Sequence, residues 1–298
     1  MITSFFQTIW MKEVFILKKF LLSLLCLALL CGCTVKVGTD NTESNISETT
    51  TEEQTTDDTA TEPTAEAVAG VEAMSTQKVI WGPGNIVDHK QPSEPLQLQS
   101  NYFDLEARWL LSEEKSVCLT FDEGYENGFT PSILDTLKEK NVKAIFFVTY
   151  DFAASNSALI ERMIKEGHIV GNHSYHHYAM DELDVSTAKE EVRFLHDYLK
   201  EKHNYTMSYF RFPKGEFSEQ SLGILRDLGY TSVFWSFAYA DWEPESQPDE
   251  AEALRHITES THPGEIILLH AVSKTNADIL GDAIDDIRKQ GYEFTVDI

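Results

Sequence analysis

The sequence is poor in cysteine and in basic residues, and both shortages exclude classes of protein. Of its four cysteines, only Cys118 lies beyond the first 33 residues, so we expect no internal disulfide and no Cys-x-x-Cys metal site in the remaining chain. Cys118 stands in an apolar run and is predicted to be an inert core residue. Lysine and arginine number 24 against 49 acidic residues. A general nucleic-acid binder needs positive surface to displace counterions, so no nucleic-acid partner is expected.

The chain also lacks an apolar run long enough to span a bilayer comfortably. Phe20–Leu30 has 11 residues, whereas a transmembrane helix needs about 20. This run follows two lysines and ends in Leu-Cys-Gly-Cys33, which is typical of a bacterial lipoprotein signal. We expect residues 1–33 to form a signal peptide that is cleaved before Cys33, and Cys33 to carry a lipid. An ordinary signal peptide with incidental cysteines is the alternative.

Large apolar side chains are scarce in residues 34–77, which we interpret as a disordered tether. Residues 39–73 hold ten acidic residues and no lysine or arginine. Such a segment cannot bury enough surface to offset its ordering entropy. The predicted protein is therefore extracytoplasmic, and only its N-terminal lipid anchors it to the bacterial cell membrane.

Residues 78–298 read as one folded domain, because apolar runs of strand type alternate with helical patterns. The alternation predicts an α/β fold with a mostly parallel sheet or an α/β barrel, and the glycines form no nucleotide-binding fingerprint. The expected strands are 116–121, 144–148, 169–172, 209–212, 231–236, 265–270 and 292–296. The expected helices lie near 130–140, 156–166, 186–202, 218–228, 249–261 and 276–290, and Thr187-x-x-Glu190 predicts a capping box for the third.

Polar side chains follow several of these strands, at the end where α/β folds place their sites. Asp122 and Glu123 follow the first expected strand. Two adjacent carboxylates repel each other and need a cation or unlike roles, although a solvated turn is the alternative.

The third expected strand is followed by a histidine-rich segment. If that segment is helical, His173 and His177 face the same way, at a spacing that suits a divalent metal. His173 with His176 is the weaker pair, and solvent-exposed histidines are the alternative. Imidazoles with a carboxylate favour Zn²⁺, Co²⁺ or Mn²⁺, which can activate a bound water.

Three further clusters come where later strands end. Arg211, in Arg-Phe-Pro-Lys-Gly215, can hold a carboxylate through two hydrogen bonds. Asp241 and Trp242 follow an apolar run. His270 is the last residue of the expected strand 265–270. A lone histidine at a strand end is more often structural than catalytic. The prediction of an active site therefore depends on all five clusters, which occur at the ends of successive strands along the chain.

This series resembles the polysaccharide deacetylases, the NodB-homology or carbohydrate esterase family 4 proteins. The five matching segments are Thr120-Phe-Asp-Glu-Gly124, His173-Ser-Tyr-His-His177, Arg211-Phe-Pro-Lys-Gly215, Asp241-Trp242 and Leu268-Leu-His270. The resemblance covers roughly residues 80–298 and implies a distorted (β/α) barrel of about seven strands. A closer resemblance is to the delta-lactam-biosynthetic de-N-acetylases, which act on muramic acid in peptidoglycan. It is carried by Phe121-Asp-Glu-Gly-Tyr-Glu-Asn-Gly128, Gly167-His-Ile-Val-Gly-Asn-His-Ser174, Phe234-Trp-Ser236 and Leu268-Leu-His-Ala-Val-Ser273.

The resemblance implies a role for each residue that matches a family motif. Asp122 would be the general base, and Arg211 would orient it. His173 and His177 would hold the metal, with Glu123 as third ligand in place of the family's second aspartate. This longer side chain puts that ligation in doubt, but it also suits the muramic acid subgroup, whose members often lack an aspartate there.

The other carried-over roles concern the leaving group and the sugar. His270 would protonate the leaving amine, with Asp241 tuning its pKa and Trp242 packing beside it. A backbone N–H near Lys214 would assist the metal at the oxyanion, and Gly215 and Trp242 are expected to contact the substrate. Apart from the resemblance, the aromatic residues of these strands are more often core or cleft wall, but Tyr239 could stack on a sugar.

The lysine at position 214 departs from the family pattern, which usually has an aromatic residue there. We interpret Lys214 as a partner for the lactyl carboxylate of N-acetylmuramic acid, which N-acetylglucosamine lacks. An exposed lysine at a loop tip is the alternative.

Together these observations predict a metal-dependent peptidoglycan de-N-acetylase that acts on N-acetylmuramic acid. The expected partners are glycan strands, with no protein partner. The alternatives are the same chemistry on N-acetylglucosamine, in peptidoglycan or chitooligosaccharides, or a glycan-binding protein that has lost its metal and its activity.

Overall fold

The computed structural model describes residues 70–84, 86–112 and 115–298. The predicted signal peptide, Cys33 and most of the predicted tether therefore lie outside the described residues. Within them, no helix combines the length and the apolar character needed to cross a membrane.

The end of the predicted tether packs on the domain. Val71 is fully buried, and the side-chain amide of Gln220 donates to its carbonyl oxygen at 3.1 Å. Gln220 also donates from its backbone to Ser75. The folded region therefore begins before residue 78, because Val71 supplies apolar surface that the more N-terminal tether lacks.

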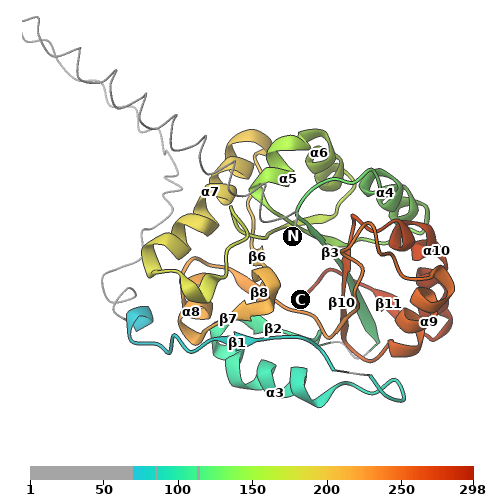
Figure 1. Ribbon diagram of the computed structural model, residues 1–298, viewed down its shortest axis with the longest axis horizontal. Helices are drawn as coiled ribbons and strands as arrows, with labels where there is room; N and C mark the ends of the chain where they lie inside the picture. The colour runs from blue at the N-terminus through green and yellow to red at the C-terminus, as the bar shows by residue number, and fades with distance from the viewer. Residues whose placement is uncertain (1–69, 85, 113–114) are drawn as a thin grey trace, which may run out of the picture. The chain divides into compact units, whose positions relative to one another are not determined.

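The domain is built on one curled parallel sheet with helices around it (Figure 1). In the described residues the sheet has nine strands, in the order β2-β8-β6-β5-β4-β3-β10-β9, with β11 also paired to β3. Its strands are β2 (Ala107–Arg108), β3 (Ser116–Glu123), β4 (Ile145–Val148), β5 (Ile169–Asn172), β6 (Tyr209–Phe210), β8 (Thr231–Val233), β9 (Phe237–Ala238), β10 (Glu265–His270) and β11 (Glu293–Phe294). A separate antiparallel pair joins β1 (Val79–Ile80) to β7 (Glu216–Phe217).

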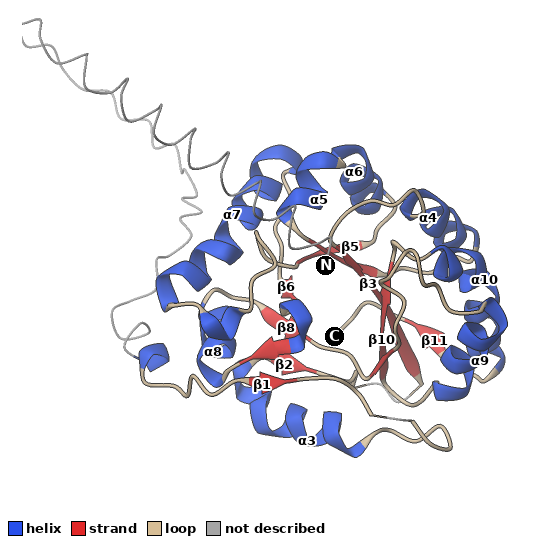
Figure 2. Ribbon diagram, viewed as in Figure 1, coloured by secondary structure: helices blue, strands red, loops and turns tan. Residues whose placement is uncertain are grey.

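The helices lie outside the curl of the sheet (Figure 2). They are α3 (Ser93–Tyr102), α4 (Thr130–Glu139), α5 (Tyr150–Ser155), α6 (Ser157–Lys165), α7 (Val185–His203), α8 (Glu219–Asp227), α9 (Glu250–Ser260) and α10 (Lys274–Lys289). Short 3-10 turns occur at η1 (Phe103–Leu105), η2 (Met180–Glu182) and η3 (Pro213–Gly215). All seven predicted strands and all six predicted helices are present. The α/β barrel class is thus confirmed, with more strands than the seven expected.

The start of α7 differs from the prediction. The helix begins at Val185, and the side chain of Asp184 accepts a hydrogen bond from the backbone of Thr187 at 2.8 Å. The predicted capping box at Thr187 and Glu190 is therefore wrong. Asp184 is an equally good cap, and it satisfies a free N–H group one turn earlier.

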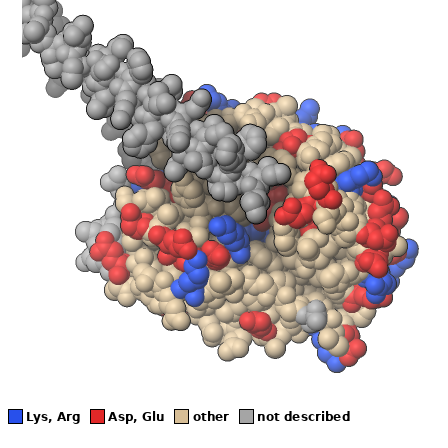
Figure 3. Space-filling view, viewed as in Figure 1, with Lys and Arg blue, Asp and Glu red and all other residues tan. Residues whose placement is uncertain are grey.

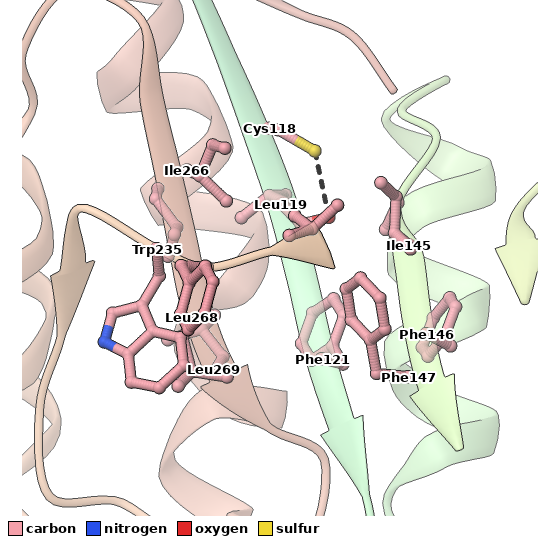
Figure 4. Close-up of a cluster of buried hydrophobic side chains, with 14 of the residues drawn as sticks. Cys118, Leu119, Phe121, Ile145, Phe146, Phe147, Trp235, Ile266, Leu268 and Leu269 are labelled. Atoms are coloured by element: carbon pink, nitrogen blue, oxygen red, sulfur yellow. Dashed lines mark hydrogen bonds between the residues drawn. The ribbon is translucent and has the colours of Figure 1, made fainter. Parts of the chain in front are cut away.

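β3 separates the apolar core from the polar site through the alternation of its side chains. Leu119 faces the helices and lines a small cavity with Ile279 of α10. The ring of Phe121 stacks on that of Phe146 at 5.1 Å between centroids (Figure 4). Cys118 is fully buried, and burial raises the pKa of its thiol to about 12, which fits the predicted inert core residue.

The register of the sheet brings the strand ends together. His270 of β10 is paired with Asp122 of β3, and Asp122 is paired with Phe147 of β4. Asn172, at the end of β5, is paired with Phe210 of β6. Because all these strands are parallel, the residues that follow them meet at one edge of the sheet.

Candidate active site

Asp122 and Arg211 form a buried ion pair at this edge. The guanidinium Nη1 lies 2.9 Å from Asp122 Oδ1, and the two residues are 8% and 0% exposed. Nη1 also donates to the hydroxyl of Thr120 at 2.7 Å. Arg211 therefore orients one carboxylate oxygen and leaves the other to face the rest of the site.

The burial of Arg211 is compensated on every side. Its Nε donates to the carbonyl of Val233 at 3.0 Å, and its Nη2 donates to that of Phe234 at 3.1 Å. The guanidinium carbon lies 4.2 Å from the ring centroid of Phe147, which gives a cation–π contact. A fixed cation next to Asp122 matters because burial alone would protonate that carboxyl.

The pKa of Asp122 is set by opposing effects. Burial raises it, but the interactions of the carboxylate with His173, Arg211 and His270 together outweigh burial and hold it below its ordinary value. Asp122 is therefore ionised at neutral pH and can accept a proton.

His173 and His177 lie side by side on the loop after β5. Their ring centroids are 4.8 Å apart, and His173 Nε2 is 3.5 Å from Asp122 Oδ2. The segment is not helical: Ser174 and His177 have φ values of 69° and 60°. The two rings meet because these left-handed residues turn the chain, and not through the helical spacing that we considered.

The protonation of both imidazoles suits metal binding. Burial lowers the pKa of His177 to about 4, with a further contribution from His173, and burial also lowers the pKa of His173. His173 Nδ1 donates to the carbonyl of Arg211 at 2.9 Å. Its Nε2 lone pair is therefore directed to the site.

These donors fit a divalent metal by their chemistry. Two neutral imidazoles beside an ionised carboxylate are ligands that such metals take. Within the described ranges, no set of three or more histidine, cysteine, aspartate or glutamate side chains is already arranged as a closed metal site. The fit therefore rests on the donor set of His173 and His177 and their closeness to Asp122.

Glu123 is not brought to this cluster. It continues β3, so its side chain points to the opposite face of the sheet from Asp122. Thr130 of α4 donates to its Oε1 at 3.4 Å, and the side chain is fully buried. Burial raises the pKa of Glu123 well above its ordinary value, and the charge of Glu126 adds to this. The predicted third ligand is thus a buried carboxylic acid that faces a helix.

His176 is also directed away from the site. Its Nδ1 lies 2.5 Å from Glu191 Oε1 of α7. This agrees with the sequence analysis, in which His173 and His176 were the weaker pair.

His270 and Asp241 form the second half of the site. Asp241 Oδ1 lies 2.7 Å from His270 Nδ1, and Oδ2 accepts from the backbone N–H of His270 at 2.8 Å. Asn276 of α10 also donates to Oδ2, at 2.6 Å. Burial lowers the pKa of His270, but the hydrogen bond and charge of Asp241, together with Asp122, raise it above its ordinary value. Among the histidines of the site, His270 is therefore the one that holds a proton most readily.

Tyr239 contacts a residue that supports the second half of the site, and its predicted stacking on a sugar stays a prediction. Its hydroxyl donates to the side-chain oxygen of Asn276, and the residue is half-buried. It therefore orients Asn276, which in turn holds Asp241. Trp242 is 50% exposed and lies edge-on to His270, with centroids 5.8 Å apart, as expected for a residue that packs beside it.

Lys214 and Gly215 lie on the turn η3. Lys214 has a φ of 60°, and its side chain is exposed. Its charge makes a small contribution to the lowered pKa of His177, after those of burial and His173. On the face shown in Figure 3, basic side chains near the middle lie among acidic ones.

Sequence reasoning missed two residues that support the site. Thr120 binds Arg211, and Asn276 binds Asp241. Thr120 stands inside a recognised motif and could have been found there. Asn276 could not, because it is 35 residues from Asp241 and lies in the first turn of a helix.

Comparison with known proteins identifies the class. The polysaccharide deacetylase family model matches residues 112–233. The chain is 42% identical over 235 residues to the peptidoglycan-N-acetylmuramic acid deacetylase PdaA of Bacillus subtilis, covering 77% of this chain and 88% of that protein. The chain therefore belongs to the polysaccharide deacetylase family, as its motifs predicted.

Solved structures agree with this assignment. That of Bacillus subtilis PdaA, a family 4 carbohydrate esterase, superposes with a TM-score of 0.71 at 40% identity, over 74% of this chain and 95% of that one. A family 4 carbohydrate esterase from Bacillus anthracis gives a TM-score of 0.62 at 36% identity, over 75% of this chain and 95% of that one.

A more distant relative in sequence acts on the other sugar, according to its name. The peptidoglycan-N-acetylglucosamine deacetylase PgdA of Listeria monocytogenes is 30% identical over 184 residues, which cover 61% of this chain and 38% of that protein.

Proposed function

We propose that this protein is a metal-dependent hydrolase that removes the acetyl group from N-acetylmuramic acid in peptidoglycan. The observation that carries the proposal is the pairing of an ionised Asp122 with a proton-holding His270 on adjacent strands. Amide hydrolysis needs one group to accept a proton and another to supply one. The identity to a named muramic acid deacetylase supports the choice of sugar.

The two halves of the site divide the proton transfers. Asp122, held by Arg211, accepts a proton from the attacking water as its oxygen bonds to the acetyl carbon. His270 then gives its proton to the sugar nitrogen as the carbon–nitrogen bond breaks, so acetate and a free amine result. Asp241 keeps His270 protonated and fixes its ring through Nδ1, so that Nε2 carries the proton that is transferred.

His173 and His177 are the residues that would hold the metal. Family 4 deacetylases generally depend on a divalent metal, and we propose Zn²⁺, with Co²⁺ or Mn²⁺ as alternatives. When bound, the metal lowers the pKa of a water and polarises the acetyl carbonyl. The side chain of Glu123 takes no part in this proposal, because it faces α4.

Lys214 would distinguish muramic acid from glucosamine. A muramic residue carries a lactyl carboxylate, and Lys214 offers an exposed cation on the turn η3, three residues after Arg211. Replacing it, as Lys214→Ala, is expected to lower activity on muramic substrates selectively. An equal loss on N-acetylglucosamine substrates would contradict this role.

We also propose that Cys33 carries a lipid and that the segment after it tethers the enzyme to the outer face of the membrane. The sequence pattern around Cys33 supports this location. Labelling cells with a fatty-acid analogue would test it: the wild type should be labelled and Cys33→Ala should not.

Acetate release is the test of the function. The full chain with added Zn²⁺ is incubated with peptide-free glycan strands, and released acetate is measured beside the Asp122→Asn and His270→Ala variants. The wild type should release acetate, and both variants should lose nearly all activity, because general acid–base groups contribute about 10²–10⁴-fold each. Equal activity in either variant would contradict the assigned roles.

A further inference from the structure

Glu191 stands at a position of α7 where an apolar side chain is expected. The other buried residues of this helix are Ala188, Val192, Leu195 and Leu199, at the spacing of a helix face that packs on a core. Glu191 lies on the same face and is 4% exposed. Burying a carboxylate in such a place costs free energy unless hydrogen bonds compensate for the lost water. Its burial therefore depends on the groups that it binds.

Both carboxylate oxygens of Glu191 bind one residue of the histidine-rich loop. The backbone N–H of His176 donates to Oε2 at 2.8 Å, and the ring Nδ1 donates to Oε1 at 2.5 Å. Hydrogen bonds to a carboxylate are shorter and stronger than those between neutral groups. Glu191 thus holds the backbone of the residue that directly precedes His177.

The turn at this point needs such support. Ser174 and His177 have φ values of 69° and 60°, and residues with a Cβ atom adopt this left-handed backbone only at a cost. Within the loop, the N–H of His177 donates to Ser174 Oγ at 2.9 Å, and that of Ser174 donates to Asn172 Oδ1 at 2.8 Å. The side chain of Asn172 donates in turn to the carbonyl of Val192 at 2.9 Å. Both ends of the loop are therefore tied to the same turn of α7, by Glu191 and by its neighbour.

The two histidines of the proposed metal site are fixed in different ways. The sheet and its neighbour hold His173, whose N–H donates to the carbonyl of Val148 and whose ring donates to that of Arg211, both at 2.9 Å. In the residues that the structure describes, the ring of His177 makes no hydrogen bond of this kind. Its place beside His173 depends on the backbone of the turn, and the backbone depends on Glu191.

We propose that Glu191 is a positioning residue for the metal site: by holding the backbone of His176, it places the ring of His177 beside that of His173. The inference rests on the proposed function, in which these two rings hold the metal. Without the carboxylate, this end of the loop loses its tie to α7, and His177 moves away from His173. Metal affinity then falls, while the two groups that transfer protons stay in place on the sheet.

The affinity for Zn²⁺ is measured by calorimetric titration of the full chain. Glu191→Ala removes both acceptor oxygens, and its affinity should fall about 10- to 100-fold, the usual effect of losing a group that orients a metal ligand. Glu191→Gln keeps the size of the side chain and one acceptor oxygen. Its affinity should therefore lie between those of the wild type and Glu191→Ala.

Two controls on the same helix separate positioning from stability. Glu190→Ala makes the same substitution at the neighbouring, exposed position and should change neither the affinity nor Tm. Leu195→Ala removes a fully buried side chain from the face that carries Glu191, about one turn further along α7. It should lower Tm because it leaves a cavity, but the Zn²⁺ affinity should stay that of the wild type.

The possible results separate this inference from the proposed function. If the wild type binds no Zn²⁺, the proposed metal site fails and the inference fails with it. If the wild type binds Zn²⁺ and both Glu191 variants keep its affinity, the inference alone is overturned; where Glu191→Ala does not fold, an unchanged affinity in Glu191→Gln overturns it. If Leu195→Ala loses as much affinity as Glu191→Ala, the role of Glu191 is merely structural.

Discussion

Replacing Asp122 with asparagine is expected to destabilise the protein much more than the loss of an ordinary salt bridge. Arg211 is 0% exposed, and Asp122 is the carboxylate that faces it. Asparagine keeps the size and one acceptor oxygen but removes the charge. Removing one partner of a buried ion pair typically costs about 3–5 kcal/mol, because the other charge is left buried and uncompensated.

The assay is thermal and urea unfolding of the full chain, with Asp135→Asn as the matched control. Asp135 also pairs with an arginine, Arg162, at 2.6 Å, but its side chain is 73% exposed, and exposed pairs contribute about 0–1 kcal/mol. For a domain of this size about 1 kcal/mol shifts Tm by roughly 2–4 °C. Asp122→Asn should therefore lower Tm by about 6–20 °C, and Asp135→Asn by less than about 4 °C. Equal, small shifts for both variants would refute the argument that Asp122 compensates a buried charge.

Two further predictions concern the pH dependence and the metal. Because Asp241 raises the pKa of His270 and activity needs the protonated ring, activity should fall as pH rises through that pKa. Asp241→Asn should move this alkaline limb of the pH profile to lower pH. Glu191→Gln, which removes the carboxylate next to His176, should leave the limb in place. An unmoved limb in Asp241→Asn would count against His270 as the acid. In calorimetric titrations with Zn²⁺, His177→Ala should weaken binding by more than about 10-fold, and Glu123→Gln should bind within about twofold of the wild type; strong loss in Glu123→Gln would show that Glu123 is a ligand after all.

The barrel and most of the site were predictable for the same reason. Parallel strands end at one edge of a sheet, so polar residues that follow apolar runs must meet there. Asp122, Arg211 and His270 lie at the ends of such strands. The 2.9 Å hydrogen bond between Arg211 and Asp122 and the pairing of His270 with Asp122 follow from this arrangement.

Glu123 shows where such reasoning fails. The apolar run predicted that the strand ends at Phe121, and the family resemblance implied that Glu123 would be a ligand of the metal. β3 continues through Glu123, and the alternation of side chains then sends the two carboxylates to opposite faces. The end of a strand is not visible in a single sequence when polar residues extend it.

The short elements and the supporting contacts were beyond the sequence for other reasons. Two-residue strands such as β7 and β9 carry no alternation that could be recognised. Glu191 and Asn276 bind residues from other parts of the chain, His176 and Asp241. Only the fold brings these groups together.

The central claim is tested most directly by locating the lost acetyl groups. Peptide-free glycan strands treated with the full chain and Zn²⁺ would be cut to disaccharides and sequenced by mass spectrometry. The account predicts that muramic acid loses its acetyl group and glucosamine keeps it. Loss from glucosamine alone, or no loss with Zn²⁺, Co²⁺ or Mn²⁺ while the glycan still binds, would contradict it.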